Sequence, residues 1–162
     1  MQNETTLSRR ALLAGLGALP LMLSRPAPSR AEALPLVTVT KDPNCGCCDG
    51  WADHMKAAGF PVRVIVADDV FPLKARLGVP AALSSCHTAE VDGYVIEGHV
   101  PPAAVKRLLD QRPAATGLAV PGMPSGSPGM DFPGVRPEVY DVIVFTPSDQ
   151  APFMRFRGTK PV

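Results

Sequence analysis

Residues 36–48 read Leu-Val-Thr-Val-Thr-Lys-Asp-Pro-Asn-Cys-Gly-Cys-Cys. The segment Leu36–Thr40 is short and rich in β-branched residues, which predicts a buried strand. Asp42-Pro43-Asn44 ends this strand, and from about Cys48 to Ala58 the apolar residues follow helical spacing until Gly59. The stretch therefore predicts a strand that leads through a cysteine-rich loop into the first turn of a helix.

The elements that follow this unit set the fold class. Val62–Val66 predicts a second strand, and Phe71–Leu77 predicts a short helix that Gly78 stops. Two further strands flank the turn Asp92-Gly93, and an amphipathic helix follows Pro101. Strand, helix, strand, helix, hairpin, helix is the thioredoxin order. We therefore expect an α/β, thioredoxin-like core over residues 34–112, with a four-stranded mixed sheet and helices on both faces.

The composition changes after residue 112. Residues 113–137 are rich in proline and glycine and show no periodicity, so they are predicted to form a loop. Strand character returns at Val139–Phe145, and Phe153–Phe156 is expected to pair with that strand. Residues 113–162 are thus predicted to be a Pro/Gly/Met-rich loop with a strand extension.

The N-terminal residues have the pattern of a targeting segment. Arg9 and Arg10 directly precede the uncharged apolar run Ala11–Leu23, which is shorter than the ~20 residues that a membrane-spanning helix needs. The small-residue site Ala31-Glu32-Ala33 follows. We interpret residues 1–33 as an export signal that resembles a twin-arginine signal. An ordinary secretory signal is the alternative, and either signal predicts a periplasmic protein.

The remaining 129 residues (162 minus 33) suit one domain. They carry 12 lysine and arginine residues against 13 aspartate and glutamate residues, with no basic cluster. This balance argues against nucleic acid as a partner. No second apolar segment is long enough to anchor this part in a membrane, so no stable membrane anchor is expected.

All four cysteines lie in this part of the chain, at Cys45, Cys47, Cys48 and Cys86. In an oxidising compartment four cysteines usually form two disulfides. Here three thiols lie within four positions, and a disulfide between adjacent cysteines is strained. At most one disulfide is expected within the cluster, and another could reach Cys86. Three close thiols and a distant fourth are better explained as ligands of a soft metal.

The predicted topology brings the fourth cysteine to the other three. If the first and last core strands are parallel and the third is antiparallel to them, then three points share one sheet edge. These points are the loop 45–48, Cys86 and His99. Thiols at a helix N-terminus are stabilised as thiolates by the helix dipole. Contiguous thiolates can bridge ions, which favours several Cu(I) ions over a single Zn(II).

Several motifs resemble those of one family. They are the run Cys45–Trp51, the segments Ser85–Thr88 and Glu97–Pro101, and the Pro-Gly-Met repeats near Met123 and Met130. The chain from about Val37 to Met130 resembles the bacterial periplasmic CopG-type copper-resistance proteins. This resemblance implies a thioredoxin-like protein with a cysteine-bridged, multinuclear copper cluster and a role in copper tolerance, including copper oxidoreductase activity. It implies Cys45, Cys47, Cys48 and Cys86 as the copper ligands.

Other side chains are secondary candidates for copper. His99 is expected at the cysteine edge, whereas strand alternation would turn His87 to the opposite side of the sheet from Cys86. Met123 and Met130 are thioethers that suit Cu(I) but could equally be packing residues, and we expect residues 117–130 to cover the cysteine edge. His54 is expected to be a surface or packing residue.

Three functions remain open at this point. One is copper binding with a redox or storage role. A second is a thiol–disulfide oxidoreductase that uses the pair Cys45 and Cys48, which has Cys-x-x-Cys spacing. A third is a carrier that passes copper to other periplasmic copper-handling proteins. Cys47 favours the first function, because a third thiol beside a redox pair would attack its disulfide.

Overall fold

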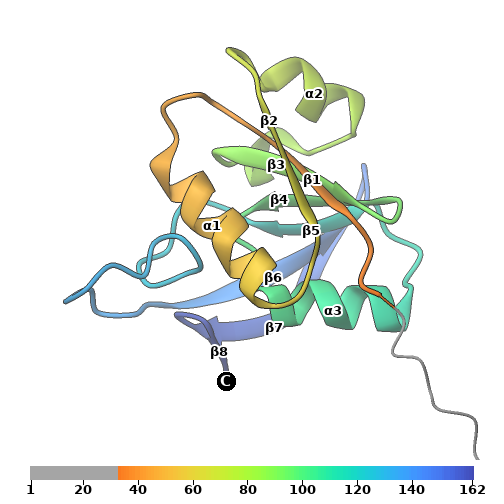
Figure 1. Ribbon diagram of the computed structural model, residues 1–162. Helices are drawn as coiled ribbons and strands as arrows, with labels where there is room; N and C mark the ends of the chain where they lie inside the picture. Colours follow the sequence, from red (N-terminus) through yellow and green to blue (C-terminus); the bar gives the residue numbers. More distant parts are fainter. Residues whose placement is uncertain (1–32) are drawn as a thin grey trace, which may run out of the picture. The chain divides into compact units, whose positions relative to one another are not determined.

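The computed structural model describes residues 33–162, a unit in which helices pack on a mixed sheet. Three α-helices, a short 3-10 helix and eight strands make up this unit (Figure 1). In chain order they are β1 (Val37–Lys41), α1 (Gly46–Ala57), β2 (Val62–Val66), α2 (Phe71–Arg76), η1 (Ala81–Leu83), β3 (His87–Val91), β4 (Tyr94–Gly98), α3 (Pro102–Gln111), β5 (Gly117–Val120), β6 (Val139–Phe145), β7 (Gln150–Arg157) and β8 (Lys160–Pro161).

The first four strands pair in the order β2-β1-β3-β4. Strand β1 is parallel to β2 and antiparallel to β3, and β3 is antiparallel to β4. The expected directions of the first, third and fourth core strands are therefore confirmed. The predicted hairpin turn is also present, since Asp92 and Gly93 have φ angles of 48° and 85°.

The sheet is larger than predicted. Strand β5 lies within the segment predicted to be a loop, and it pairs parallel to β4. Strands β6, β7 and β8 then continue the same sheet by antiparallel pairing, so the mixed sheet has eight strands and the four-stranded prediction is wrong. All four residues of β5 are buried. A short strand that is buried on both sides has no alternation of apolar and polar residues. The sequence pattern that usually predicts a strand was therefore absent from β5.

Helices cover both faces of the sheet, as expected. Helices α1 and α3 share the larger core with the sheet residues on one face, with Trp51 and Leu108 fully buried. Helix α2 lies at the opposite face, where Lys74 contacts Thr88 and Glu97. A smaller apolar cluster on that face includes Leu83, Val95, Ala119 and Phe145.

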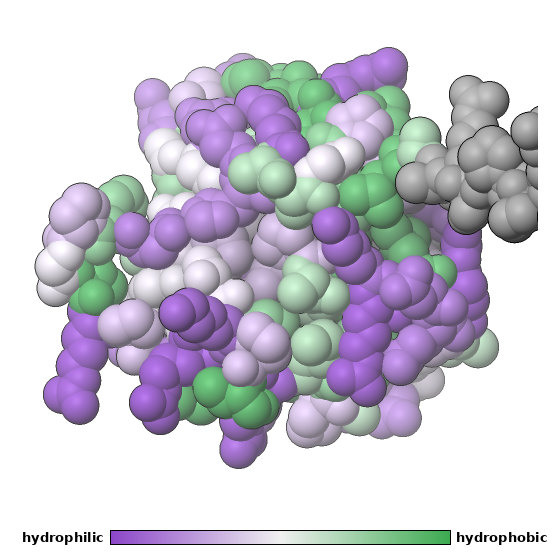
Figure 2. Space-filling model, turned by 60° about the horizontal axis from the view of Figure 1, so that its bottom comes forward, coloured by the Kyte–Doolittle hydropathy of each residue, from purple (hydrophilic) through white to green (hydrophobic). Residues whose placement is uncertain are grey.

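Hydrophilic side chains cover much of the face seen in Figure 2, and hydrophobic residues lie there in separate patches. Within residues 33–162 no helix combines the length and the hydrophobicity needed to cross a bilayer. The predicted export signal, apart from Ala33, lies outside the described residues.

Candidate metal centre

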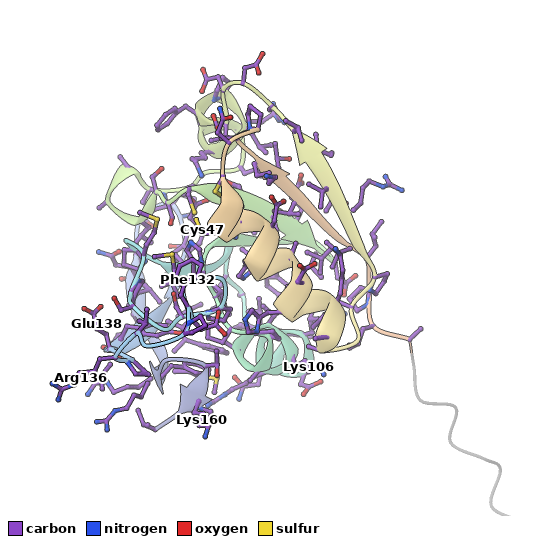
Figure 3. All side chains as sticks on the ribbon, turned by 60° about the vertical axis from the view of Figure 1, so that its left-hand side comes forward. Cys47, Lys106, Phe132, Arg136, Glu138 and Lys160 are labelled. Atoms are coloured by element: carbon purple, nitrogen blue, oxygen red, sulfur yellow. A yellow bond between two sulfur atoms is a disulfide. The ribbon has the colours of Figure 1, made fainter. Side chains whose placement is uncertain are left out.

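The cysteine motif forms the N-terminal end of α1. Cys45 is the N-cap residue, and Cys47 and Cys48 lie in the first helical turn, slightly earlier than the sequence predicted. Cys45 and Cys48 form a disulfide with their Cα atoms 5.4 Å apart, whereas Cys47 is a free cysteine. Cys48 is fully buried, and Cys47 is partly exposed at this end of α1 (Figure 3). The motif therefore presents a dithiol pair in its oxidised form beside a third, free thiol.

A buried lysine holds this motif to the sheet. The Nζ atom of Lys41, at the end of β1, donates hydrogen bonds to the Cys45 carbonyl oxygen at 3.1 Å and to Asp49 Oδ2 at 3.0 Å. Lys41 is only 5% exposed. It thus fixes the backbone of Cys45 relative to the first turn of α1. The sequence analysis did not identify Lys41, and its only signal was a lysine at the end of a strand predicted to be buried.

The Cys86 sulfur lies beside the sulfur atoms of Cys45, Cys47 and Cys48. Cys86 immediately precedes β3, and the sulfur atoms of all four cysteines lie within 4.8 Å of one another. The expectation that the topology would bring Cys86 beside the loop 45–48 is confirmed. Burial, reinforced by the charge of Cys47, raises the pKa of Cys86 to about 11. In the absence of metal Cys86 is therefore a protonated thiol at neutral pH.

Two buried histidines adjoin Cys86. Its sulfur lies 3.1 Å from His99 Nε2 and 3.3 Å from His87 Nδ1, and the three side chains form a second group of possible metal ligands. His99 Nδ1 lies 2.7 Å from the Pro128 carbonyl oxygen. Since a carbonyl only accepts, Nδ1 carries the proton and the Nε2 lone pair of His99 faces Cys86.

Burial lowers the pKa of both histidines, most strongly that of His87, which is fully buried and also lies near His99 and Lys74. Both are neutral at pH 7 and can offer a nitrogen lone pair. Among the described residues, none forms a hydrogen bond with His87 Nε2. The alternation argument for His87 was wrong, because Cys86 lies before the strand and its side chain does not follow the strand's alternation.

The loop between β5 and β6 packs against the cysteine helix. A Cβ atom added to Gly129 would collide with the Cys47 carbonyl oxygen and would lie 2.7 Å from the backbone nitrogen of Trp51. Asp131 in the same loop pairs with His54 of α1 at 2.9 Å. Both figures of the ribbon show this loop beside the N-terminal half of α1 (Figures 1 and 3). Part of segment 117–130 therefore does cover this end of the helix.

The other residues singled out from the sequence are Met123, Met130, His54 and Trp51, and they differ in exposure. Met123 is 53% exposed, and Met130, which follows Gly129, is half-buried. His54 is partly exposed and lies on the surface of α1, as expected. Trp51 is fully buried, and its Nε1 donates a hydrogen bond to the Val100 carbonyl oxygen.

The donor atoms fit a soft metal ion. Four sulfurs within 4.8 Å of one another, with two imidazoles at the edge of the group, match the ligand preference of Cu(I). A thiol must lose its proton to bind, so metal binding would displace the proton of Cys86. The disulfide joins two of the four sulfurs, and a two-electron reduction is needed before all four can act as thiolates.

Comparison with known proteins agrees with this chemistry. A family described as a protein of unknown function, DUF411, matches residues 83–130. A solved structure named copper resistance protein copG, form 1, is 42% identical, with a TM-score of 0.71, and the match covers 77% of this chain and 99% of that one. Form 2 is also 42% identical, with a TM-score of 0.70 and coverages of 76% and 98%. No curated protein sequence matches the chain.

Proposed function

Because this chain belongs to the CopG copper resistance protein family, we propose that it binds copper through its four cysteines. One observation carries the proposal: four sulfurs from two distant parts of the chain lie within 4.8 Å of one another. In the reduced protein Cys45, Cys47, Cys48 and Cys86 are the thiolate ligands of a multinuclear Cu(I) cargo. His99, His87, Met123 and Met130 are secondary ligands. Thiolates have spare lone pairs, so four of them can serve more than one ion by bridging.

The reduced form of the Cys45–Cys48 pair gives this site an electron source as well as a binding role, and the disulfide is its oxidised form. In the proposed reaction the thiolates of Cys45 and Cys48 each give one electron to a Cu(II) ion. Two Cu(II) ions become two Cu(I) ions, and one sulfur–sulfur bond forms. A two-electron thiol reductant then restores both thiolates by thiol–disulfide exchange. Cys47 and Cys86 retain the Cu(I) product, and their coordination to Cu(I) keeps the Cys47 thiolate from attacking the new disulfide.

The proposed location and organisation follow from the sequence. Residues 1–33 direct export to the periplasm and are removed there. Residues 34–112 form a thioredoxin-like core that carries the cysteines, and residues 113–162 form an extension. The order β2-β1-β3-β4 and its strand directions support this reading of the core. Other periplasmic copper-handling proteins would be the partners.

A thiol–disulfide oxidoreductase is the second candidate. The observation that favours it is the disulfide between Cys45 and Cys48 at a helix N-terminus, where a dithiol pair of a redox enzyme is usually found. In that function the pair exchanges electrons with protein thiols, and copper has no part. Cys47 and Cys86 are then bystanders.

The variant Cys47→Ser separates the two functions. Serine is close in size to cysteine and Cys47 is partly exposed, so the fold should be retained. Reduced protein would be titrated with Cu(I) under anaerobic conditions against a chromogenic chelator. We expect the variant to lose tight Cu(I) binding, because one bridging sulfur is missing. Full copper stoichiometry in Cys47→Ser would contradict the role of Cys47 as a bridging ligand. Normal disulfide exchange in an unmodified protein that binds no Cu(I) would support the second candidate.

A further inference from the structure

A buried ion pair lies beneath the segment that carries Cys86. Lys74 Nζ of α2 lies 2.6 Å from Glu97 Oε1 of β4, with the two side chains 4% and 0% exposed. The Lys74 ammonium also donates to Thr88 Oγ1 at 2.8 Å, and the Thr88 hydroxyl donates to Glu97 Oε2 at 2.7 Å. Neither residue of this pair is among the predicted copper ligands.

The Glu97 carboxylate has one more partner, and this partner belongs to the cysteine segment. The Ser85 backbone N–H donates to Glu97 Oε1 at 2.5 Å. Ser85 directly precedes Cys86 and lies in neither a helix nor a strand. Its backbone is therefore held to the sheet by a side chain, in place of the ladder hydrogen bonds that fix a strand.

The local packing also fits a fixed position for Ser85. Gly98 follows Glu97 and has a φ of +70°, and a Cβ atom there would lie 2.6 Å from Ser85 Oγ. The Ser85 hydroxyl donates to the Gly122 carbonyl oxygen at 3.1 Å. Strand β4 and the loop after β5 thus contact Ser85, the neighbour of Cys86, from two sides.

Stability alone does not account for the ion pair. An apolar pair of similar volume is usually as stable as a buried ion pair, because both charges lose their hydration. What an apolar side chain cannot do is accept the Ser85 N–H. We propose that Glu97 is a positioning residue for Cys86: its carboxylate fixes the Ser85 amide and so keeps the Cys86 sulfur within reach of the other three. This rests on the proposed function, in which Cys86 is a ligand.

Two matched double variants of the full chain isolate the acceptor from the charge. Lys74→Met with Glu97→Gln removes both charges but keeps a carbonyl oxygen for the Ser85 N–H. Lys74→Met with Glu97→Met has the same length and no acceptor at residue 97. Both pairs are neutral and fill the space, so circular dichroism and thermal unfolding should show a folded protein for each. Glu90→Gln, at an exposed position of β3, is the control.

The first readout needs no copper. With Cys45 and Cys48 replaced by serine, diamide is used to form the Cys47–Cys86 disulfide, and its rate is measured. We expect the Gln variant to match the parent and the Met variant to be about tenfold slower, the size of effect of one lost hydrogen bond. Equal rates in the two variants would overturn the proposal. If either double variant does not fold, hydrogen exchange of the Ser85 amide in the unmodified protein decides: strong protection is expected, and exchange at a free-loop rate overturns it.

The second readout uses Cu(I) and all four cysteines. The Met variant should bind Cu(I) about 10- to 100-fold more weakly than the Gln variant, as is typical when a group that orients a ligand is lost. Unchanged affinity in the Met variant would overturn the proposal. Failure of the proposed function is seen separately, because the unmodified protein would then bind no Cu(I) while the disulfide rates still differed.

Discussion

Cys86 differs from the other three cysteines in its surroundings. Cys45, Cys47 and Cys48 lie at the N-terminal end of α1, where the helix dipole favours thiolates. Cys86 lies between two neutral histidines, and burial holds it as a protonated thiol. The preceding residue, Ser85, donates its backbone N–H to Glu97. Under the proposed function, Cys86 is therefore the ligand whose position depends most on its surroundings.

This difference predicts a pH dependence for the metal-free protein. Alkylation requires a thiolate, so the rate at Cys86 should rise with a midpoint near pH 11, above the ordinary thiol value of 9.0. Cys47 adds to the shift through its charge, and Cys47→Ser should lower the midpoint. Mass spectrometry of iodoacetamide-treated protein resolves the two sites. A midpoint at or below 9 for Cys86 in the unmodified protein would contradict the buried-thiol description.

At the scale of single residues, the sequence predicts the clustering of the four cysteines better than the residues that hold them in place. The motif and the strand order together place four cysteines at one edge. Lys41 and Lys74 escaped prediction because lysine is almost always exposed, and only tertiary contacts reveal that these two are buried and paired. The orientation of His87 relative to Cys86 was predicted wrongly because strand alternation was assumed for both residues. Only His87 belongs to β3, and Cys86 precedes it.

Among the elements, the loop between β5 and β6 packs tightly against the cysteine helix. Gly129 has a φ of +86° and leaves no room for a side chain against Cys47 and Trp51. Gly122 in the same loop has a φ of +73°, but a Cβ atom there would meet nothing within 4 Å. An alanine at either position would therefore strain the backbone, but only an alanine at residue 129 would also collide with its neighbours.

The comparison of Gly129→Ala with Gly122→Ala tests whether the loop is docked on α1. Both should lose stability from the positive φ, and Gly129→Ala should lose a further ~1–3 kcal/mol, as is usual for overpacking. Chemical denaturation measures the free energy of unfolding, and limited proteolysis reports release of the loop. Equal losses in the two variants would show that the loop does not pack on Cys47 in solution.

The two methionines of this loop give a second prediction for the element. Replacing Met123 and Met130 together by leucine should change stability by less than about 1.5 kcal/mol, because leucine and methionine are similar in volume. A thioether binds Cu(I) without losing a proton and exchanges readily, so the rate of Cu(I) transfer to a chelator should change. An unchanged transfer rate would make both methionines packing residues.

Element predictions from sequence succeeded where a period or a turn was present. The hairpin at Asp92-Gly93, helix α3 and strand β6 each carry such a signal. Strand β5 does not, because four residues buried on both sides look like part of the Pro- and Gly-rich loop around them. Because β5 joins β4 to β6, β7 and β8, missing it left the predicted sheet with four strands instead of eight.

At the scale of the whole molecule, the eight-stranded sheet connects the residues that adjoin the cysteine site. Lys41 ends β1, Cys86 directly precedes β3, and Glu97 lies in β4. Strand β5 leads into the loop that packs on Cys47. The core and the extension therefore meet at this end of α1. Family membership and site geometry both support a copper-related function, and the disulfide between Cys45 and Cys48 is consistent with the proposed redox reaction.

The most direct test of the central claim is copper analysis combined with a thiol count. The protein would be purified anaerobically from the periplasm, its proposed location, and its cysteines alkylated before and after treatment with a Cu(I) chelator. A four-thiolate copper site predicts more than one copper ion per chain and four cysteines that react only after copper is removed. Protein without copper, with a Cys45–Cys48 disulfide and with Cys47 and Cys86 open to alkylation, would contradict it.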